Sequence, residues 1–441
     1  MNTNPTLQKN ALVLGGSLGG LLAARVLSAH FEQVVILEKD SVHRVPESRK
    51  GQPQTQHLHG LLPAGLRILN QYFPNIENDM VANGANVMDF AETMNWFSYG
   101  GFKKRFTFGI NAVTISRPML EHIVRERVLA LPNVRLEDNA SVKKLLTSSD
   151  QQQIIGVEIE KGEQTQQMLA DLAVDATGRG SRTPQWFKEM GYEAPEVSEV
   201  KVNVGYTTRT YKRDPDDSLG RDWMLYTPQA PEETRFGGMF PVEGDKWVLT
   251  VGGWHGDHAA KDEKGFMEFV KNLPHPLFYK IASYSEPLSE VIPFKFPFSL
   301  RRHYEKLDRF PTGYLVLGDA ITSFNPIYGQ GMSSAALQAE ALDKVLQQNP
   351  LPEQLWKSYF KEITPIVDMI WQLATGEDFR FVETIGKRPP GISLINKYVA
   401  KVHKASLSDE VVCKAFLYVM GLLKPPTSLF HPRIFWRVMT A

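Results

Sequence analysis

The sequence predicts an α/β protein in which parallel strand–helix units carry an inserted antiparallel sheet and are followed by a helical C-terminal region. An apolar strand, a glycine-rich turn, an amphipathic helix and a second apolar strand follow one another over residues 11–38. Between about residues 198 and 300, period-2 alternation replaces this pattern. Residues 314–346 then return to an apolar strand, a glycine-rich turn and a long helix.

The first unit has the layout of a Rossmann-like βαβ nucleotide site. Gly15 allows a sharp turn, Gly20 lets the helix pack closely on the sheet, and the helix N-terminus offers free N–H groups to a pyrophosphate. Ser17 stands where the G-x-G-x-x-G motif has its middle glycine, and a small hydroxyl residue still allows close phosphate approach. Glu38 ends the second strand and is placed to accept hydrogen bonds from an adenosine ribose. The alternative is a loop that only joins strand to helix.

Composition excludes several classes of protein. Lys+Arg and Asp+Glu are equal at 49 each, so we expect no nucleic-acid partner. The sequence contains no run of about 18 uncharged apolar residues, so it predicts no membrane span. The one cysteine, Cys413, excludes an intrachain disulfide and is expected to be buried. Residues 1–10 lack the layout of a signal peptide, which favours a cytoplasmic location.

The segment after Glu38 is polar and rich in turns, and contains His57 and His59. Because it follows the second strand of a nucleotide fold, it should lie near the carboxyl edge of the sheet, where ligands bind. We expect these histidines to line the ligand cleft, with a solvated loop as the alternative. We expect no metal site, since no third ligand has suitable spacing.

The next segments predict a second lobe and a return to the first. Residues 85–112 alternate in short aromatic strands, and Ser116 is expected to cap a helix that begins at Arg117, whose side chain reaches a ligand or lies exposed. An apolar strand then leads into the small-residue turn of residues 175–182. The sheet of residues 198–300 has a concave apolar face suited to covering a substrate. Asp319 follows a later strand, and Gly329 to Met332 open a helix.

Residues 351–441 are expected to be helical, with many aromatic side chains near the end. The simpler interpretation is a helical cap packed on the two lobes. The alternative is a surface that touches a membrane or admits an apolar substrate.

Three stretches in fixed order, residues 15–38, 175–182 and 318–331, give the chain a resemblance to a known family. It resembles the FAD-dependent group A flavoprotein monooxygenases, the aromatic hydroxylase and squalene-epoxidase type, and is most similar to bacterial polyether-type epoxidase-like FAD oxidoreductases. The shared segments are Gln-x-x-His-x-His, Asp-Ala-Thr-Gly-Arg-Gly-Ser-Arg and Gly-Asp-Ala followed by Asn-Pro-Ile-Tyr-Gly-Gln-Gly-Met. The second of these departs from the family's usual Asp-Gly dipeptide.

The resemblance implies a Rossmann-like FAD-binding domain of the three-layer ββα type. Its parts are residues 1–84, 113–197 and 301–350, with substrate-domain strands at 85–112, a substrate-binding antiparallel sheet at 198–300 and a C-terminal helical region at 351–441. The implied cofactor-binding residues are Gly15, Gly16, Ser17, Leu18, Gly19, Gly20, Glu38, Lys39, Arg49, His59, Arg117, Asp175, Gly178, Arg182, Gly318, Asp319, Pro326, Gly329, Gly331 and Met332. Gly329, Gln330 and Gly331 are the implied catalytic residues, beside the flavin.

The implied reaction transfers one oxygen atom from a flavin C4a-hydroperoxide to an apolar alkene or aromatic substrate, as an epoxidation or hydroxylation in polyketide or terpenoid metabolism. NADPH or NADH is the implied electron donor, directly or through a partner flavin reductase. Two alternatives stay open: an FAD-dependent reductase or dehydrogenase of prenyl-type or halogenase-related substrates, and a non-catalytic flavin-binding redox sensor. Peripheral membrane contact through the C-terminal region is a further expectation.

Overall fold

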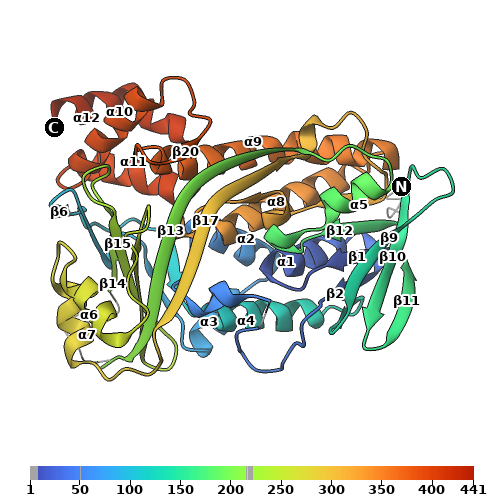
Figure 1. Cartoon of the computed structure of the whole chain (residues 1–441), viewed down its shortest axis with the longest axis horizontal. Helices are drawn as coiled ribbons and strands as arrows, with labels where there is room; N and C mark the ends of the chain where they lie inside the picture. Colours follow the sequence, from blue (N-terminus) through green and yellow to red (C-terminus); the bar gives the residue numbers. More distant parts are fainter. Residues whose placement is uncertain (1–7, 50, 215, 217–221) are drawn as a thin grey trace.

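The computed structural model describes residues 8–49, 51–214, 216 and 222–441. Figure 1 shows a parallel sheet with its helices near the N-terminus, a large antiparallel sheet at the opposite end, and C-terminal helices above that second sheet. The two long antiparallel strands β13 (Glu196–Lys212) and β17 (Ile292–His303) run between the two ends. They connect the two lobes as one continuous structure.

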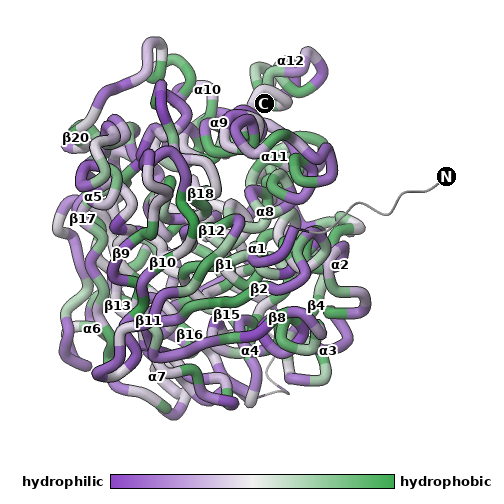
Figure 2. Tube along the Cα trace, turned by 90° about the vertical axis from the view of Figure 1, so that its right-hand side faces the viewer, coloured by the Kyte–Doolittle hydropathy of each residue, from purple (hydrophilic) through white to green (hydrophobic). Residues whose placement is uncertain are grey.

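The parallel sheet has the strand order β18-β12-β1-β2-β8. Its strands are β1 (Gln8–Leu14), β2 (Phe31–Leu37), β8 (Val134–Glu137), β12 (Leu172–Asp175) and β18 (Tyr314–Val316). All four pairings are parallel, so the carboxyl ends of the strands meet at one edge. The central strands β1, β2 and β12 are mostly apolar, as their colour in Figure 2 shows, and their buried residues form the interior of this lobe.

Helices cover one face of this sheet and a β-meander covers the other, which confirms the predicted three-layer fold class. The helices of this lobe are α1 (Leu18–Leu27), α2 (Pro63–Tyr72), α3 (Ile76–Ala82), α4 (Arg117–Leu129), α5 (Thr183–Glu189), α8 (Gly331–Gln347) and α9 (Pro352–Asp378). The meander consists of β9 (Ser141–Thr147), β10 (Ile154–Lys161) and β11 (Gln164–Leu169). Helix α1 packs between α4 and α8. The hydroxyl of Ser116 accepts from the amide of Met119, as predicted for the cap of α4.

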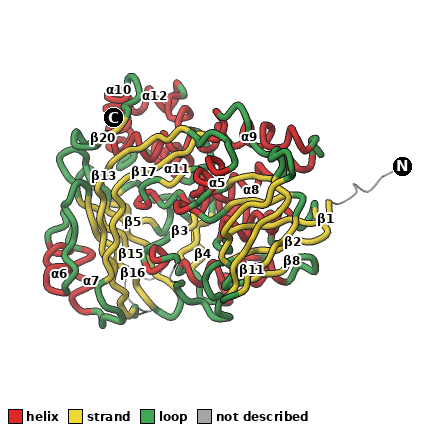
Figure 3. Tube along the Cα trace, turned by 45° about the vertical axis from the view of Figure 1, so that its right-hand side comes forward, coloured by secondary structure: helices red, strands yellow, loops and turns green. Residues whose placement is uncertain are grey.

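The large sheet has the order β19-β17-β13-β16-β15-β14-β5-β6, with β20 paired to β13. Its other strands are β5 (Met94–Ser98), β6 (Gly101–Phe102), β14 (Trp223–Tyr226), β15 (Arg235–Val242), β16 (Lys246–Gly253), β19 (Thr322–Ser323) and β20 (Ile385–Gly386). Helices α6 (Glu263–Lys271) and α7 (Leu277–Tyr284) pack on its outer face (Figure 3). The inner face is left for the cavity described below.

The structure divides the predicted strand region of residues 85–112 between two sheets. Strands β5 and β6 join the large sheet, whereas β4 (Asn86–Asp89) pairs with β7 (Asn111–Thr114). Strand β3 (Gly60–Leu61) pairs with β7 from the other side. This small sheet carries the chain from the first lobe to the second.

The C-terminal region is helical, with α10 (Ile392–Ala405), α11 (Glu410–Met420) and α12 (Pro432–Thr440). Phe416 of α11 packs against Trp96 of β5, with ring centroids 5.3 Å apart, so these helices contact the large sheet. Cys413 is buried in the same cluster. Within the described residues, none of the helices has the length and apolar character needed to cross a membrane.

Candidate active site

The three stretches singled out in the sequence meet at the carboxyl edge of the parallel sheet. The backbone amide of Ala176 donates to Leu14 over 2.9 Å, and that of Leu317 donates to Asp175 over 2.8 Å. The glycine turn is tight, because a Cβ on Gly20 would lie 1.8 Å from the carbonyl oxygen of Gly15. Gly15 itself has φ of 102°, which favours glycine. These contacts explain why both outer positions of the turn are glycine.

The N-terminus of α1 is left without a capping side chain. Ser17 is the N-cap residue, but its hydroxyl donates to Glu121 Oε2 over 3.0 Å and does not accept from the first turn of its own helix. No acidic residue lies in that turn. The amides of this turn, Leu18 and Gly19 included, are thus available to a bound anion such as a pyrophosphate.

Four charged side chains form a buried cluster beside this turn. Arg49 contacts Glu38 Oε2 over 2.9 Å and Glu121 Oε1 over 2.5 Å, while Arg117 lies 3.4 Å from Glu121 Oε2. Burial raises the pKa of Glu121, but the positive charges of Arg117 and Arg49 outweigh it and hold that pKa below its usual value. Glu38 also accepts from the amide of Gly16 over 2.9 Å. The cluster holds the predicted ribose acceptor at the start of α1.

The carboxylate of Asp175 organises the turn that follows β12. It accepts from the backbone amide of Thr177 over 2.9 Å and from the hydroxyls of Thr177, Ser181 and Thr183. Its side chain therefore faces the turn, while Gly178, with φ of 80°, lies near Asp319.

Two arginines, Arg117 of the cluster above and Arg179, approach the sheet edge near Asp319. Asp319 has accessible surface although protein surrounds it on most sides, and burial raises its pKa while the charges of Arg117 and Arg179 oppose that rise. Arg179 lies over the rings of Phe296 and Phe298, at 5.0 and 4.3 Å. Arg117 Nε and Arg179 Nη2 are buried without a hydrogen-bond partner among the described residues. Each arginine therefore keeps one N–H group without an acceptor in the described part of the protein, close to the edge where an anionic ligand would lie.

The loop before α8 presents an open surface. A Cβ built on Gly329 or on Gly331 meets no atom within 4 Å, so a ligand can approach the backbone there. Gln330 is buried and its Oε1 has no partner among the described residues. Met332 is buried in the first turn of α8.

Asp378 at the end of α9 holds this loop in place. Its Oδ1 accepts from Asn325 Nδ2 over 2.9 Å, from Tyr328 OH over 2.8 Å and from Trp254 Nε1 over 3.0 Å. Burial raises the pKa of Asp378 to about 6, against the lowering effect of these hydrogen bonds. One carboxyl group thus links the loop, α9 and the large sheet.

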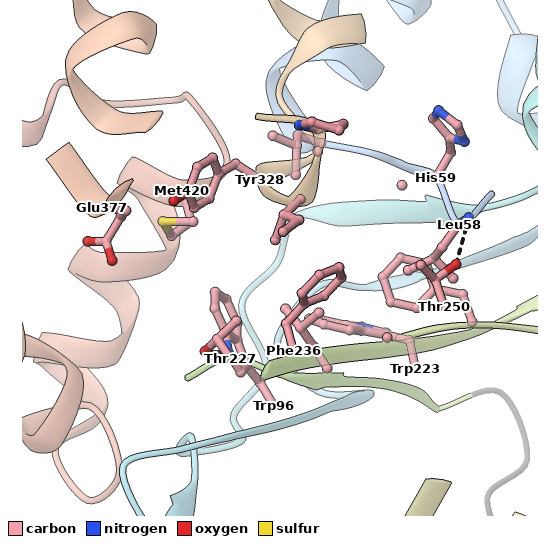
Figure 4. A pocket seen from close by; sticks show the side chains of 18 of the residues that line it. Leu58, His59, Trp96, Trp223, Thr227, Phe236, Thr250, Tyr328, Glu377 and Met420 are labelled. Carbon is pink, nitrogen blue, oxygen red and sulfur yellow. Dashed lines mark hydrogen bonds between the residues drawn. The ribbon is translucent and has the colours of Figure 1, made fainter. Parts of the chain in front are cut away.

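A cavity of about 210 Å³ lies between this loop and the large sheet (Figure 4). One wall is the loop from Pro326 to Gly329, and the other walls come from the large sheet, the small sheet and the C-terminal helices. Its aromatic lining comprises Phe90, Trp96, Tyr206, Trp223, Phe236, Phe240, Trp254, Tyr328 and Phe381. The cavity suits a ligand with an apolar, flat body.

The structure separates the two histidines of the 57–59 segment. His59 lines the cavity, and its Nδ1 lies 2.9 Å from the carbonyl oxygen of His57, which can only accept. Burial lowers the pKa of His59 to about 3, so the ring is neutral and its Nε2 is an acceptor. His57 is buried against Thr208, with Nδ1 and Oγ1 2.8 Å apart. No group of three His, Cys, Asp or Glu side chains in the described part of the chain could hold a metal ion.

The remaining predicted residues lie around this edge in different settings. Lys39 is exposed at the end of β2, and the exposed Arg182 lies 5.4 Å from the ring of Trp186. Gly318 donates to Gln338 Oε1 over 2.8 Å at the start of the turn that carries Asp319.

The donors, the open glycines and the ribose acceptor fit FAD. Sequence reasoning assigned no role to Glu121, Arg179, Glu377, Asp378 or Arg380, all of which lie at the site or its cavity. Glu121 follows Arg117 by four residues on one helix, a local spacing that signals a pair. The acidic pair at 377–378 follows the mostly apolar or small residues 369–376 at the end of α9, and it is the signal for the others.

Comparisons with known proteins agree with this architecture. The family model described as FAD binding domain matches residues 8–374. Protein Rv3254 of Mycobacterium tuberculosis is 31% identical, covering 94% of this chain and 90% of that protein. The 3-demethoxyubiquinol 3-hydroxylase of Escherichia coli is 25% identical, covering 81% of this chain and 84% of that enzyme. The crystal structure of PqsL, described as a probable FAD-dependent monooxygenase from Pseudomonas aeruginosa, has the same fold, with a TM-score of 0.65, 18% identity and coverage of 85% and 96%.

Proposed function

The chain belongs to the FAD binding domain family and is a flavoprotein of the FAD-dependent monooxygenase type, and we propose that it inserts one oxygen atom of O2 into an apolar alkene or aromatic substrate. The product is an epoxide or a hydroxylated compound. The observation that carries this proposal is the cavity that joins the glycine loop at Pro326 to Gly329 with an aromatic lining. A substrate in that cavity lies directly against the predicted flavin position.

Bound FAD supplies the activation of O2 and the transfer of one oxygen atom. The residues of this chain place the substrate and keep the site dry. The rings of Phe236, Trp223 and Trp96 line the wall opposite Tyr328 and limit the room for water. A Cβ built on Gly329 or Gly331 meets no atom within 4 Å, so the backbone there is open to the cofactor, and we expect the amide of Gly331 to stabilise charge that develops on it.

The proposal includes NADPH or NADH as the electron donor, used directly or through a separate flavin reductase. Asp175-Ala176 stands where the family usually has Asp-Gly in a motif associated with NAD(P)H, so we propose both direct reduction and reduction through a reductase. A role in polyketide or terpenoid metabolism is consistent with the apolar cavity.

The experiment follows the visible spectrum of the purified FAD-loaded protein under anaerobic conditions. Addition of NADPH, NADH or a reductase system is expected to bleach the flavin band, and admission of isotopically labelled O2 with an apolar alkene or phenol should give a product that carries the label. A reduced or halogenated product that lacks the label would contradict the monooxygenase proposal and favour one of the alternatives. Bleaching without any product from a broad substrate panel would favour the redox sensor.

We further propose that the C-terminal region contacts an anionic lipid surface. Residues 381–441 contain nine Lys and Arg against three Asp and Glu, in a chain whose net charge is zero. Phe430, Phe435 and Trp436 are exposed there, and the first two stack on Tyr398 at 4.8 and 5.4 Å. Exposed aromatic side chains with surrounding positive charge are typical of peripheral membrane contact.

Co-sedimentation with phosphatidylglycerol vesicles tests this contact. We expect binding that weakens with salt, is absent with phosphatidylcholine, and falls several-fold in Trp436→Ser. Leu169→Ser, at an exposed apolar residue of β11 in the other lobe, is the matched control and should bind as wild type. Equal binding by the two variants would refute the assignment of the surface.

A further inference from the structure

A carboxylate and a guanidinium stand in the largely aromatic cavity, at the wall formed by the end of α9. Glu377 lies in the last turn of α9 and Arg380 lies three residues later. In Figure 4, Glu377 and His59 lie on opposite sides of the cavity view, with Tyr328 between them. Charged side chains are costly to bury, so a pair among aromatic rings indicates a specific role.

Both terminal nitrogens of the Arg380 guanidinium are engaged by the protein. Its Nη1 donates to Glu377 Oε2 over 2.9 Å, and its Nη2 contacts the carbonyl oxygen of Ala230 over 3.1 Å and the hydroxyl of Tyr99. Only 4% of the arginine side chain is accessible. Arg380 therefore positions Glu377 and offers little to a ligand.

Glu377, unlike Arg380, is accessible to a ligand in the cavity. Its side chain is 30% accessible, although protein surrounds it and raises its pKa to about 7, aided by the negative charge of Asp378. Its Oε2 is held by Arg380, and its Oε1 has no hydrogen-bond partner among the described residues. An acceptor oxygen is thus free at the polar end of an aromatic cavity.

We infer that Glu377 Oε1 accepts a hydrogen bond from a neutral donor on the ligand, a hydroxyl or an amide N–H, so that the cavity selects an apolar molecule with such a group and rejects carboxylates. An arginine in a cavity usually indicates an anionic ligand, but here the carboxylate of Glu377 already pairs with Arg380. A ligand carboxylate would meet Glu377 as a like charge, which disfavours it. The inference rests on the proposed function only in taking this ligand to be the substrate.

Ligand binding tests the inference without turnover. Trp96, Trp223 and Trp254 line the cavity, so quenching of tryptophan fluorescence in the FAD-loaded protein reports occupancy, and no electron donor is added. The probes are 2-naphthol, its methyl ether and 2-naphthoate, at about pH 8, where the naphthol is neutral and the naphthoate is charged. We expect 2-naphthol to bind about tenfold or more tightly than either of the others.

The variant Glu377→Gln keeps a hydrogen-bonding partner for Arg380 but removes the negative charge. We expect its preference for 2-naphthol over 2-naphthoate to fall about tenfold, because the carboxylate no longer meets a like charge. Glu383→Gln, at an exposed carboxylate six residues away, is the control and should keep the wild-type preference. Equal or tighter binding of 2-naphthoate by wild type, an unchanged preference in Glu377→Gln, or binding of none of the three probes would overturn the inference. Failure to detect oxygen transfer would leave this binding result intact.

Discussion

Gly331→Ala is expected to weaken FAD binding by about tenfold or more while leaving the stability of the apoprotein unchanged or slightly raised. A Cβ at this position meets no protein atom within 4 Å, and the residue lies in the first turn of α8, where alanine is well accommodated. The methyl group would instead enter the space proposed for the flavin ring. The measurement pairs thermal unfolding of the apoprotein with titration of FAD by its visible absorbance.

Gly20→Ala is the matched comparison at the other end of the site. Its Cβ would lie 1.8 Å from a backbone oxygen, so we expect both a lower melting temperature and loss of FAD. Gly20→Ala thus tests space that the fold itself needs, whereas Gly331→Ala tests space that only the cofactor needs. If Gly331→Ala bound FAD as tightly as wild type, the flavin would have to lie elsewhere.

Asp378→Ala is expected to destabilise the protein by about 3 kcal/mol or more, because the donors of Trp254, Asn325 and Tyr328 lose their common acceptor. Asp378→Asn keeps an acceptor oxygen and should destabilise far less. Urea unfolding of both variants gives the measurement, with Glu353→Gln, an exposed carboxylate at the start of α9, as the neutral control.

The same carboxyl gives stability a pH dependence with a defined sign. Burial raises the pKa of Asp378 from 3.8 to about 6, so between these values the folded state keeps a proton that the unfolded state releases. Stability should therefore fall as pH rises through this window, by about 3 kcal/mol at most, and stay lower above it. Asp378→Asn should reduce that fall and leave the part due to Glu377, whose pKa burial raises from 4.5 to about 7. An identical pH profile in wild type and Asp378→Asn would contradict the role assigned to this group.

The fold class and the sheet edge were predictable because their signals are local. The glycine turn at residues 15–20, the acid at Glu38 and the strand ends before Ala176 and Leu317 each lie within one strand–helix unit. Parallel pairing then brings the strand ends together by geometry. The predicted cap at Ser116 depends on three consecutive residues and is also found.

The wall of the cavity could not be predicted in the same way. Glu377 and Asp378 reach it only because α9 extends along the first lobe and the chain then returns to pair β20 with β13. Asp378 contacts Trp254, 124 residues earlier. Sequence periodicity reports which face of a helix is buried but not which distant element covers it. The C-terminal residues were accordingly expected as a cap, with an apolar surface as the alternative.

The family match ends at residue 374, whereas Glu377, Arg380, Phe381, His403 and Met420 of the cavity all follow it. The segment that completes the ligand chamber is therefore outside the part that defines the flavoprotein. Substitutions in this last part of the cavity wall can therefore change the preferred molecule without altering the residues assigned to the cofactor. Exchanging the segment after residue 374 between relatives should then transfer substrate selectivity together with that segment.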